Sequence, residues 1–342
     1  MPVSLLRNLL KIPSPSGKEK ELGIYLVKRL RKNFKVKIQK VKDNFNILAF
    51  AGKPSLILTT HLDTVPNQLE IKEDKTFIYG RGACDAKGAM SSMIIAAEKA
   101  KIKGLTDFGL LFDVCEESDF SGIKKAINLV NPKYVIVGEP TNFKVIEGQK
   151  GLLGIKIIYK GKSAHGSIPE KGISAISNLI TILSELSKIN FPESSLRKTT
   201  INIGKIKGGT ALNVVPDYAE ASLELRTTIS NKEILNIICK KIFKSNIKIL
   251  YSFEPVINKF NFIDNYEKII VPYFTEMYFW NKKSQTVVFG PGNPDYAHSN
   301  NEKIKKSDLT KASKEYYKII STLSLNTKKS IKGDKNGNSQ GI

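Results

Sequence analysis

Along the first part of the chain, short apolar runs alternate with stretches in which apolar residues recur every three or four positions. The short runs are typical of strands, and the longer spacing is typical of amphipathic helices. The predicted strands span residues 34–41, 46–50, 55–60, 108–114 and 134–137, and the predicted helices span 16–32, 89–100 and 123–130. This alternation of strands and helices predicts a layered α/β sheet.

From about Lys150 the pattern changes to longer β-rich runs separated by two helical stretches. The predicted strands span residues 151–159, 200–206, 219–227 and 249–253, and the predicted helices span 172–186 and 234–243. The resulting β-α-β-β-α-β order is the ferredoxin-like arrangement. It predicts an inserted α+β domain at 150–254, within a first domain made of residues 1–149 and 255–326.

The earlier character of the sequence returns after the insertion. We predict a helix at 266–279, a strand at 286–289 and a last helix at 307–323. Residues 327–342 are polar and rich in Gly, Asn and Lys, and this composition predicts a disordered tail.

Polar side chains follow the predicted strands at the points where they end. The run Leu-Ile-Leu-Thr-Thr-His-Leu-Asp places His61 and Asp63 two positions apart, so both side chains project to the same side of extended backbone. A histidine that ligates a metal commonly has its other ring nitrogen held by a carboxylate. Because ligands bind at the carboxyl ends of strands in open α/β sheets, we expect a site at this edge.

Four further residues in similar contexts can complete a metal site with His61: Asp85, Glu117, Glu139 and His298. Two imidazoles and three carboxylates suit Zn²⁺, with Co²⁺ and Mn²⁺ as alternatives. One carboxylate can bridge two ions, so five ligands are enough for a two-metal centre with a shared water.

Each of these residues also has an ordinary interpretation. Adjacent glutamates such as Glu116 and Glu117 are more often part of a solvated loop, and a single histidine is more often incidental. That interpretation is weaker here because the chain has only three histidines, His61, His165 and His298. Each of them lies in a Gly-, Ser- or Asp-rich segment.

Composition narrows the class of protein. The 342 residues and 41% hydrophobic content suit a two-domain globular protein. The formal charge of +22 comes from lysines spread along the whole chain and not from one basic stripe, so nucleic-acid binding is not favoured. The cysteines Cys84, Cys115 and Cys239 form no pair motif, and we expect reduced thiols. No apolar run approaches the roughly 20 residues of a membrane span and no signal peptide is apparent, so we expect a cytoplasmic protein.

These motifs resemble the dinuclear zinc family of amino-acid deacylases and exopeptidases. The family includes acetylornithine deacetylase, succinyl-diaminopimelate desuccinylase, aminoacylase and the glutamate-releasing carboxypeptidases. The resemblance runs from about Ser4 to Leu323 and meets the family's motifs in order. It implies a zinc-exopeptidase-like layered catalytic domain with an inserted ferredoxin-like dimerisation domain that acts as a lid.

The resemblance also implies a role for each residue of the metal site. His61 and Glu139 would hold one ion, Glu117 and His298 the other, and Asp85 would bridge them. In the same way, Asp63 would orient His61, and Glu116 would be the general base that takes the proton of the attacking water.

In the inserted domain the resemblance implies three further residues. His165, in Ser-Ala-His-Gly-Ser, would reach the active site of a partner subunit and stabilise the oxyanion, which requires a homodimer. Asn213 and Arg226 would bind the oxygens and carboxylate of the substrate. The ordinary alternatives are a surface-loop histidine for His165 and a turn residue for Asn213.

From the resemblance we predict a hydrolase that cleaves the amide bond of a small N-acyl amino acid, of the N-acetylornithine, N-acetyl-lysine or N-succinyl-diaminopimelate type. Such a deacetylase would serve amino-acid biosynthesis. The first alternative is a metallopeptidase of the same family, a dipeptidase or carboxypeptidase. A remote alternative is a non-catalytic protein that binds nucleic acid through its basic surface.

Overall fold

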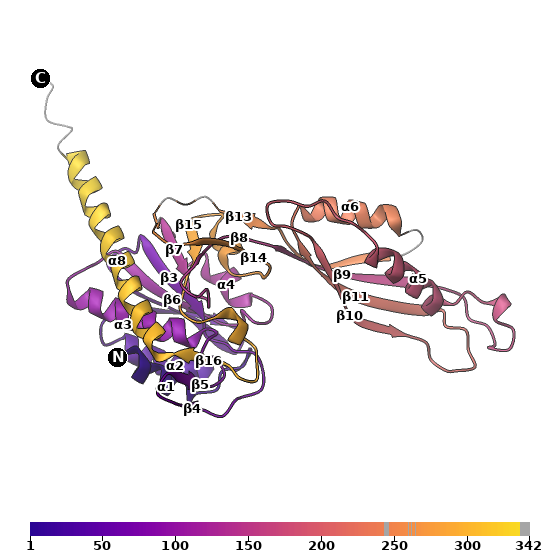
Figure 1. The fold of residues 1–342 in the computed structure, drawn as a ribbon, viewed down its shortest axis with the longest axis horizontal. Coiled ribbons are helices and arrows are strands. Elements are labelled where there is room, and N and C mark those ends of the chain that lie inside the picture. The colour runs from indigo at the N-terminus through magenta and orange to yellow at the C-terminus, as the bar shows by residue number, and fades with distance from the viewer. Residues whose placement is uncertain (243–245, 259, 261, 264, 336–342) are drawn as a thin grey trace, which may run out of the picture. The chain divides into compact units, whose positions relative to one another are not determined.

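The computed structural model describes residues 1–242, 246–258, 260, 262–263 and 265–335, with side chains described as far as residue 324. The chain forms two compact units (Figure 1). The first unit contains Met1–Glu147, Asn258–Ile269 and Phe279–Ile342, and the second contains Gly148–Ile257 and Ile270–Tyr278. This agrees with the predicted fold class, a layered α/β domain that carries an inserted α+β domain.

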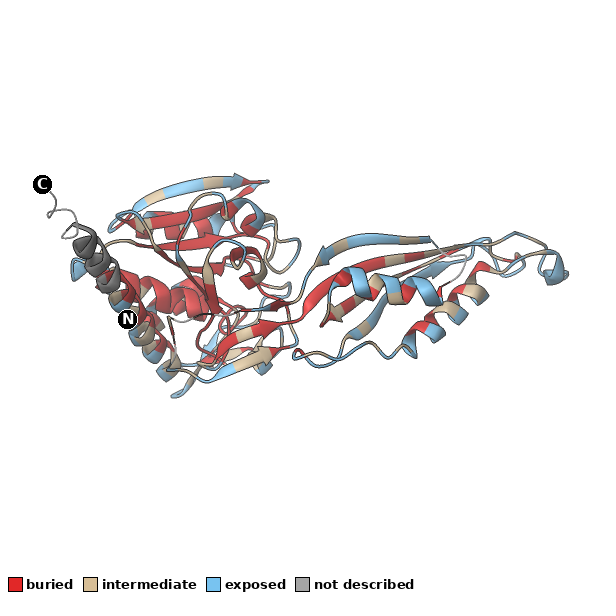
Figure 2. Ribbon diagram, turned by 90° about the horizontal axis from the view of Figure 1, so that it is seen from above, coloured by how far each residue is buried: buried red, intermediate tan, exposed pale blue. Residues whose placement is uncertain are grey.

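The first unit is built on a mixed sheet with the strand order β1-β2-β6-β3-β7-β15-β8. Its strands are β1 (Lys35–Val41), β2 (Asn44–Ala51), β3 (Leu56–His61), β6 (Phe108–Asp113), β7 (Tyr134–Val137), β8 (Val145–Gln149) and β15 (Gln285–Val288). The four central strands β6, β3, β7 and β15 are mutually parallel, whereas β1, β2 and β8 run antiparallel to their neighbours. All residues of β3 and β6 are buried, which explains their continuous apolar runs. Figure 2 shows buried residues along the interior strands and exposed residues on the outer elements.

Four helices contact this sheet: α2 (Lys20–Leu30), α3 (Lys87–Ile102), α4 (Ser121–Ala126) and α8 (Lys306–Lys335). Helix α1 (Pro2–Leu10) packs on α3 and α8. The short helix α7 (Met277–Trp280) crosses the boundary between the two units. Small residues fill α3, and it is buried around most of its circumference, in contact with α1, α8 and the sheet. The sequence predicts this helix from the apolar face of Met90, Met93, Ile94 and Ala97, and the structure buries other faces of the helix as well.

A small three-stranded sheet of order β16-β5-β4 stands beside the main one. Its strands are β4 (Lys72–Glu73), β5 (Phe77–Tyr79) and β16 (Lys303–Lys305). Two further short strands, β13 (Val256–Ile257) and β14 (Lys268–Val271), pair with β8. None of these five strands was predicted. Four of them are only two or three residues long and carry no periodic signal, and β14 lies inside the segment predicted as a helix at 266–279.

The second unit has the ferredoxin-like order. It comprises β9 (Gly151–Lys160), α5 (Ala175–Ser187), β10 (Thr200–Gly208), β11 (Tyr218–Thr227), α6 (Asn231–Lys241) and β12 (Asn246–Phe253). The strand order is β10-β11-β9-β12, with every neighbouring pair antiparallel. Apolar residues of α5 and α6 pack against those of β9 and β11 to form a separate core. The predicted last residue of the second helix, 243, lies outside the described residues.

Two predicted segments are wrong. Residues 266–279 do not form one helix, because Pro272 lacks the N–H that a helix interior needs and the run Ile269–Val271 favours extended backbone. The predicted disorder is wrong for residues 327–335, because α8 continues to Lys335. The polar composition used for that prediction contains lysines, which are good helix formers, and no proline. Residues 336–342 lie outside the described residues.

The second unit includes residues 270–278, which we had assigned to the first domain. The N–H of Lys150 donates to the carbonyl of Val271 at 3.3 Å. The Gln149 side chain bonds the Thr275 hydroxyl at 2.6 Å and its carbonyl at 3.2 Å. Phe253 contacts the ring of Phe274, with centroids 5.2 Å apart. No helix of the described residues is long and apolar enough to cross a membrane.

Candidate metal centre

Most of the predicted metal ligands lie just past the carboxyl ends of adjacent parallel strands. His61 is the last residue of β3, Glu117 follows β6, and Glu139 follows β7. His298 lies in the loop after β15, and Asp85 lies in the loop before α3. Because neighbouring parallel strands end at the same edge, the five segments converge there, as the strand-end pattern predicted.

The side chains form one continuous set of contacts. Nε2 of His61 lies 3.1 Å from Oδ1 of Asp85 and 3.9 Å from Oε1 of Glu139. Nε2 of His298 lies 3.2 Å from Oδ2 of Asp85 and 2.7 Å from Oε1 of Glu117. Asp85 is therefore at the centre, with each of its two oxygens facing a different imidazole.

These separations fit a pair of divalent ions. Around a tetrahedral zinc ion with bonds of about 2.1 Å, ligand atoms are about 3.4 Å apart. The potential ligand atoms of His61, Asp85 and Glu117 all lie within 4.8 Å of one another. Nitrogen and carboxylate donors suit Zn²⁺, Co²⁺ or Mn²⁺, so the residues present fit the predicted two-ion centre.

His61 is oriented by the backbone of Asp63. Its Nδ1 lies 2.9 Å from the carbonyl oxygen of Asp63 and 3.6 Å from the carboxylate Oδ1. The first contact favours a proton on Nδ1, which leaves Nε2 free to bind an ion. We had expected the carboxylate to have this task, and the nearer partner is the carbonyl of the same residue.

The carboxylate of Asp63 is bonded mainly to the turn that carries the two glutamates. It accepts the N–H of Glu116 through Oδ1 and the N–H of Glu117 through Oδ2, both at 3.0 Å. Oδ2 also accepts the hydroxyl of Ser16 at 2.6 Å. Cys115, which precedes the glutamates, has a φ of 61°, and the turn presents two adjacent, partly buried carboxylate side chains.

Glu139 is held by close backbone packing. The N–H of Gly138 donates to the carbonyl of Thr59 at 2.7 Å, which fastens the start of the segment to β3. A Cβ at Gly290 would lie 2.5 Å from the carbonyl oxygen of Glu139, so only glycine permits this approach. The turn that contains Gly290 thus determines the position of the Glu139 segment.

The electrostatics of the cluster reflect its excess of negative charge. Hydrogen bonds to Asp85 and Glu117 raise the pKa of His298 to about 10. Burial opposes ionisation of Asp85, but its hydrogen bonds to His298 and His61 outweigh burial and hold its pKa below the usual range. Burial, followed by the charge of Asp85, raises the pKa of Glu117. Several carboxylates at one partly buried place favour the binding of cations.

In the second unit, the predicted residues His165 and Asn213 are neighbours. His165 forms a β-bridge with Val214, and the N–H of Gly166 donates to the carbonyl of Asn213 at 2.7 Å. The His165 and Asn213 side chains are exposed, and Nδ1 of His165 lies 2.7 Å from the hydroxyl of Ser167.

Arg226 lies toward the other end of the second unit's sheet. The His165 and Asn213 segments flank the start of β11 at Tyr218, whereas Arg226 pairs with Leu152 near the strand's far end. At about 3.4 Å per residue, these two positions on β11 are about 27 Å apart. One copy of the second unit therefore cannot bring Arg226 and His165 to the same small molecule.

The sequence analysis did not single out Ser16, Arg81 or Glu302, which all bond to segments of the cluster. Two weak signals were present. Arg81 lies in the same glycine-rich stretch as Asp85, and Glu302 follows His298 by four residues. Neither signal reveals a contact, because the partners are far apart in the sequence.

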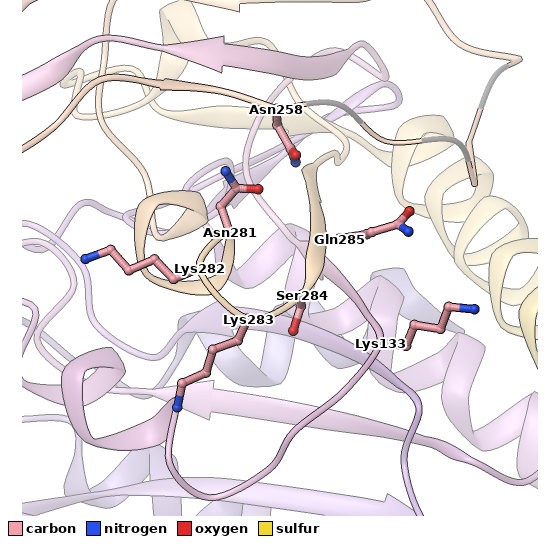
Figure 3. A pocket seen from close by; sticks show the side chains of 7 residues that line it. All are labelled: Lys133, Asn258, Asn281, Lys282, Lys283, Ser284 and Gln285. Atoms are coloured by element: carbon pink, nitrogen blue, oxygen red, sulfur yellow. The ribbon is translucent and has the colours of Figure 1, made fainter. Parts of the chain in front are cut away.

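A separate polar cavity of about 460 Å³ lies in the first unit and includes none of these residues. It is lined by Lys133, Asn258, Asn281, Lys282, Lys283, Ser284 and Gln285. Figure 3 shows that its three lysine side chains extend in different directions. Their ammonium groups do not converge, so the cavity has no focused anion site.

Comparisons with known proteins agree with this geometry. A family model described as a peptidase dimerisation domain, of the M20 peptidases, matches residues 147–245. The chain is 33% identical to a protein of Aspergillus flavus named "Probable carboxypeptidase", with 93% of this chain and 89% of that protein covered. It is 31% identical to a peptidase M20 domain-containing protein of Schizosaccharomyces pombe, with 93% and 84% covered.

Solved structures give the same fold. A tripeptidase from Staphylococcus aureus superposes with a TM-score of 0.78 at 20% identity, covering 95% of this chain and 98% of that one. The sequence identity to the two curated relatives, over nearly the whole chain, establishes more than the fold. This protein belongs to the M20 family of metallopeptidases.

Proposed function

We propose that this protein is a dinuclear metal-dependent exopeptidase that hydrolyses the amide bond of a dipeptide or of the C-terminal residue of a short peptide. The observation that supports it most is the central position of Asp85, whose two oxygens face His61 and His298 at 3.1 and 3.2 Å. His61 and Glu139 would hold one ion, Glu117 and His298 the other, and Asp85 both. The printed names of the relatives favour a peptidase over our first prediction, an N-acyl amino acid deacylase.

When bound, the two ions would polarise the scissile carbonyl and lower the pKa of a shared water. Glu116 would take the proton of that water and pass it to the leaving amine, because its carboxylate is adjacent to Glu117 and is not itself a ligand. Asp63 fixes the backbone of both glutamates, so a carboxylate that would hold an ion and a carboxylate that would move the proton stand at the same strand end.

Arg226 is proposed to bind the carboxylate of the substrate. Lys150 lies near it, and burial together with the positive charges of Arg197 and Arg226 lowers the pKa of Lys150. Positive charge is therefore concentrated at this end of the second unit. Arg226 pairs with Glu224 at 2.9 Å, and a carboxylate substrate would compete with Glu224 for its guanidinium fork.

Two copies of the chain are proposed to build each active site. Arg226 would come from one copy, and His165 with Asn213 from the other, because the two ends of β11 are too far apart to act together. Strand β10 offers a surface for the contact between copies. It is an edge strand, nearly all of it is exposed, and Ile203 and Ile206 are 39% and 59% exposed. Such an edge is suited to pairing with another chain.

A substrate panel tests this proposal. The purified protein, with its metal content measured, is assayed against dipeptides, tripeptides with free or amidated C-termini, N-acetylornithine and N-succinyl-diaminopimelate. We expect hydrolysis of dipeptides and of free C-termini, and loss of activity on amidation because Arg226 loses its partner. Turnover of the acylated amino acids alone would replace this proposal by the deacylase. No turnover of any substrate by protein that holds two ions would contradict both.

A further inference from the structure

Arg81 and Glu302 form an ion pair that is almost completely buried in the first unit. Nη1 of Arg81 lies 2.8 Å from Oε2 of Glu302, and the two side chains are 4% and 1% exposed. A pair of charges removed from water contributes little net stability, because the cost of desolvation is as large as the attraction. Its presence therefore calls for an explanation other than stability.

The carboxylate of Glu302 is bonded to the loop that carries Asp85. Its Oε1 accepts the backbone N–H groups of Cys84 and Asp85, each at 3.0 Å. Both of its oxygens are thus occupied, one by this loop and one by Arg81. Glu302, which is distant in the sequence, thus holds the backbone of Asp85 in place.

The guanidinium of Arg81 is bonded to the segment that carries His298. Nη1 also donates to the carbonyl of Ser299, next to His298, at 3.3 Å, and Nε donates to the carbonyl of Asn67 at 3.2 Å. The N–H of Gly80 donates to the carbonyl of Glu302 at 3.1 Å. The ion pair therefore joins the Asp85 loop and the His298 segment by side-chain and backbone bonds.

We propose that the Arg81–Glu302 pair is a positioning device that fixes Asp85 and His298 relative to each other and so sets the affinity for the second metal ion. This inference rests on the proposed function, in which Asp85 bridges and His298 and Glu117 hold that ion. Neither Arg81 nor Glu302 would be a ligand of the ions, because the described bonds of both side chains go to protein groups. Both act through the backbone of the two ligand segments.

A positioning role and a purely structural role predict different metal binding when the ion pair is replaced by uncharged side chains. The double variant R81M/E302L removes both charges and keeps side chains of similar volume, so it avoids an isolated buried charge. A structural role predicts that this variant behaves as wild type once it is folded. A positioning role predicts that it folds but binds the second ion weakly.

The test is titration of metal-free protein with Co²⁺, in which binding is measured by calorimetry and by the visible absorption of the bound ion. Thermal unfolding of the same samples shows whether each variant is folded. We expect wild type to bind two ions. We expect E302Q and R81M/E302L to bind the ion at Glu117 and His298 about 10- to 100-fold more weakly, as is typical when the residues behind a ligand are replaced. The ion at His61 and Glu139 should be weakened less, because Asp85 alone of its ligands is affected. R81K keeps the positive charge but loses the two-pronged guanidinium group. Its affinity for the second ion should lie between those of wild type and E302Q.

The exposed pair of Arg7 and Glu73 is the matched control, since its atoms are 2.9 Å apart and both side chains are 43% exposed. R7M/E73Q should bind both ions as wild type does. The inference is overturned if folded E302Q, or folded R81K should E302Q not fold, binds both ions with wild-type affinity. If wild type itself fails to bind two ions, the proposed function is wrong and not only the positioning role.

Discussion

The carbonyl oxygen of Asp63 lies 2.9 Å from Nδ1 of His61, nearer than the carboxylate of the same residue at 3.6 Å. One residue thus does two tasks with two groups. Its backbone orients the imidazole, and its carboxylate fastens the turn of Glu116 and Glu117.

Replacement of Asp63 by Asn should therefore spare the ion at His61. The carbonyl remains, whereas the amide can accept only through one oxygen and must leave one of the two glutamate N–H groups without its acceptor. We expect the ion at Glu117 and His298 to bind at least about 10-fold more weakly, measured by Co²⁺ titration. If D63N instead lost the ion at His61, the carboxylate of Asp63 and not its carbonyl would be the group that orients the imidazole.

Replacement of Glu116 by Gln should separate catalysis from metal binding. Glu116 is proposed to move the proton and to ligate nothing, so the variant should keep two ions while kcat falls about 10²- to 10⁴-fold. E117Q is the matched comparison, because it should lose an ion as well as activity. Metal analysis and steady-state kinetics on the same preparation measure the two effects separately. If E116Q kept full activity, Glu116 would not be the general base.

Mixed dimers test the contribution of the second copy. H165A and E116Q should each be inactive alone. A dimer of the two has one site with both Glu116 and His165 when the histidine comes from the partner, so an equimolar mixture that exchanges subunits should recover about a quarter of wild-type activity.

The same mixture recovers nothing if each site uses its own His165. Covalently linked dimers of H165A with H165A provide the control, since they contain no histidine in either arrangement.

Glu19 should make stability depend on pH. Its side chain is fully buried, Oε1 accepts the N–H groups of Gly17 and Cys115, and Oε2 has no hydrogen-bond partner among the described residues. Burial raises its pKa in the folded state. The folded protein therefore binds this proton more tightly than the unfolded chain does, and ionisation above a pH of about 4.5 costs stability.

E19Q keeps the acceptor and removes the charge. We expect it to melt at a higher temperature than wild type at pH 8 and at a similar temperature at pH 4, measured by circular dichroism. An equal difference at both pH values would show that ionisation of Glu19 does not affect stability. L22A, which removes a buried apolar side chain from α2, the helix that begins directly after Glu19, should lower the melting temperature at both pH values.

The sequence was sufficient for those parts of the fold that depend on local pattern. The buried runs of β3 and β6 and the order of the inserted domain follow from periodicity, and the polar residues after each strand mark the ligand edge. The period of two predicted that His61 and Asp63 share a side, which is correct. It could not predict which atom of Asp63 is nearer, because that depends on the turn after the strand.

The parts that could not be predicted depend on contacts between distant segments. Arg81 and Glu302 are separated by 221 residues, and neither local sequence indicates that the two side chains are in contact. The helix predicted at 266–279 is wrong because Pro272 interrupts the segment and residues 268–271 pair as a strand with β8. The separation of Arg226 from His165 required the strand register, which periodicity does not provide.

Strand β15 has a further consequence for how the molecule is made. The chain produces β7 and β8 almost in succession, yet β15 lies between them in the sheet, paired with β7 along its length and with β8 at Val288. During synthesis the sheet must remain open at its centre until residues 285–288 leave the ribosome. The inserted unit, whose sheet is formed by strands that follow one another in the chain, is free to fold first. The edge that carries the ligands needs His298, so it is completed late in the synthesis and folding of the chain.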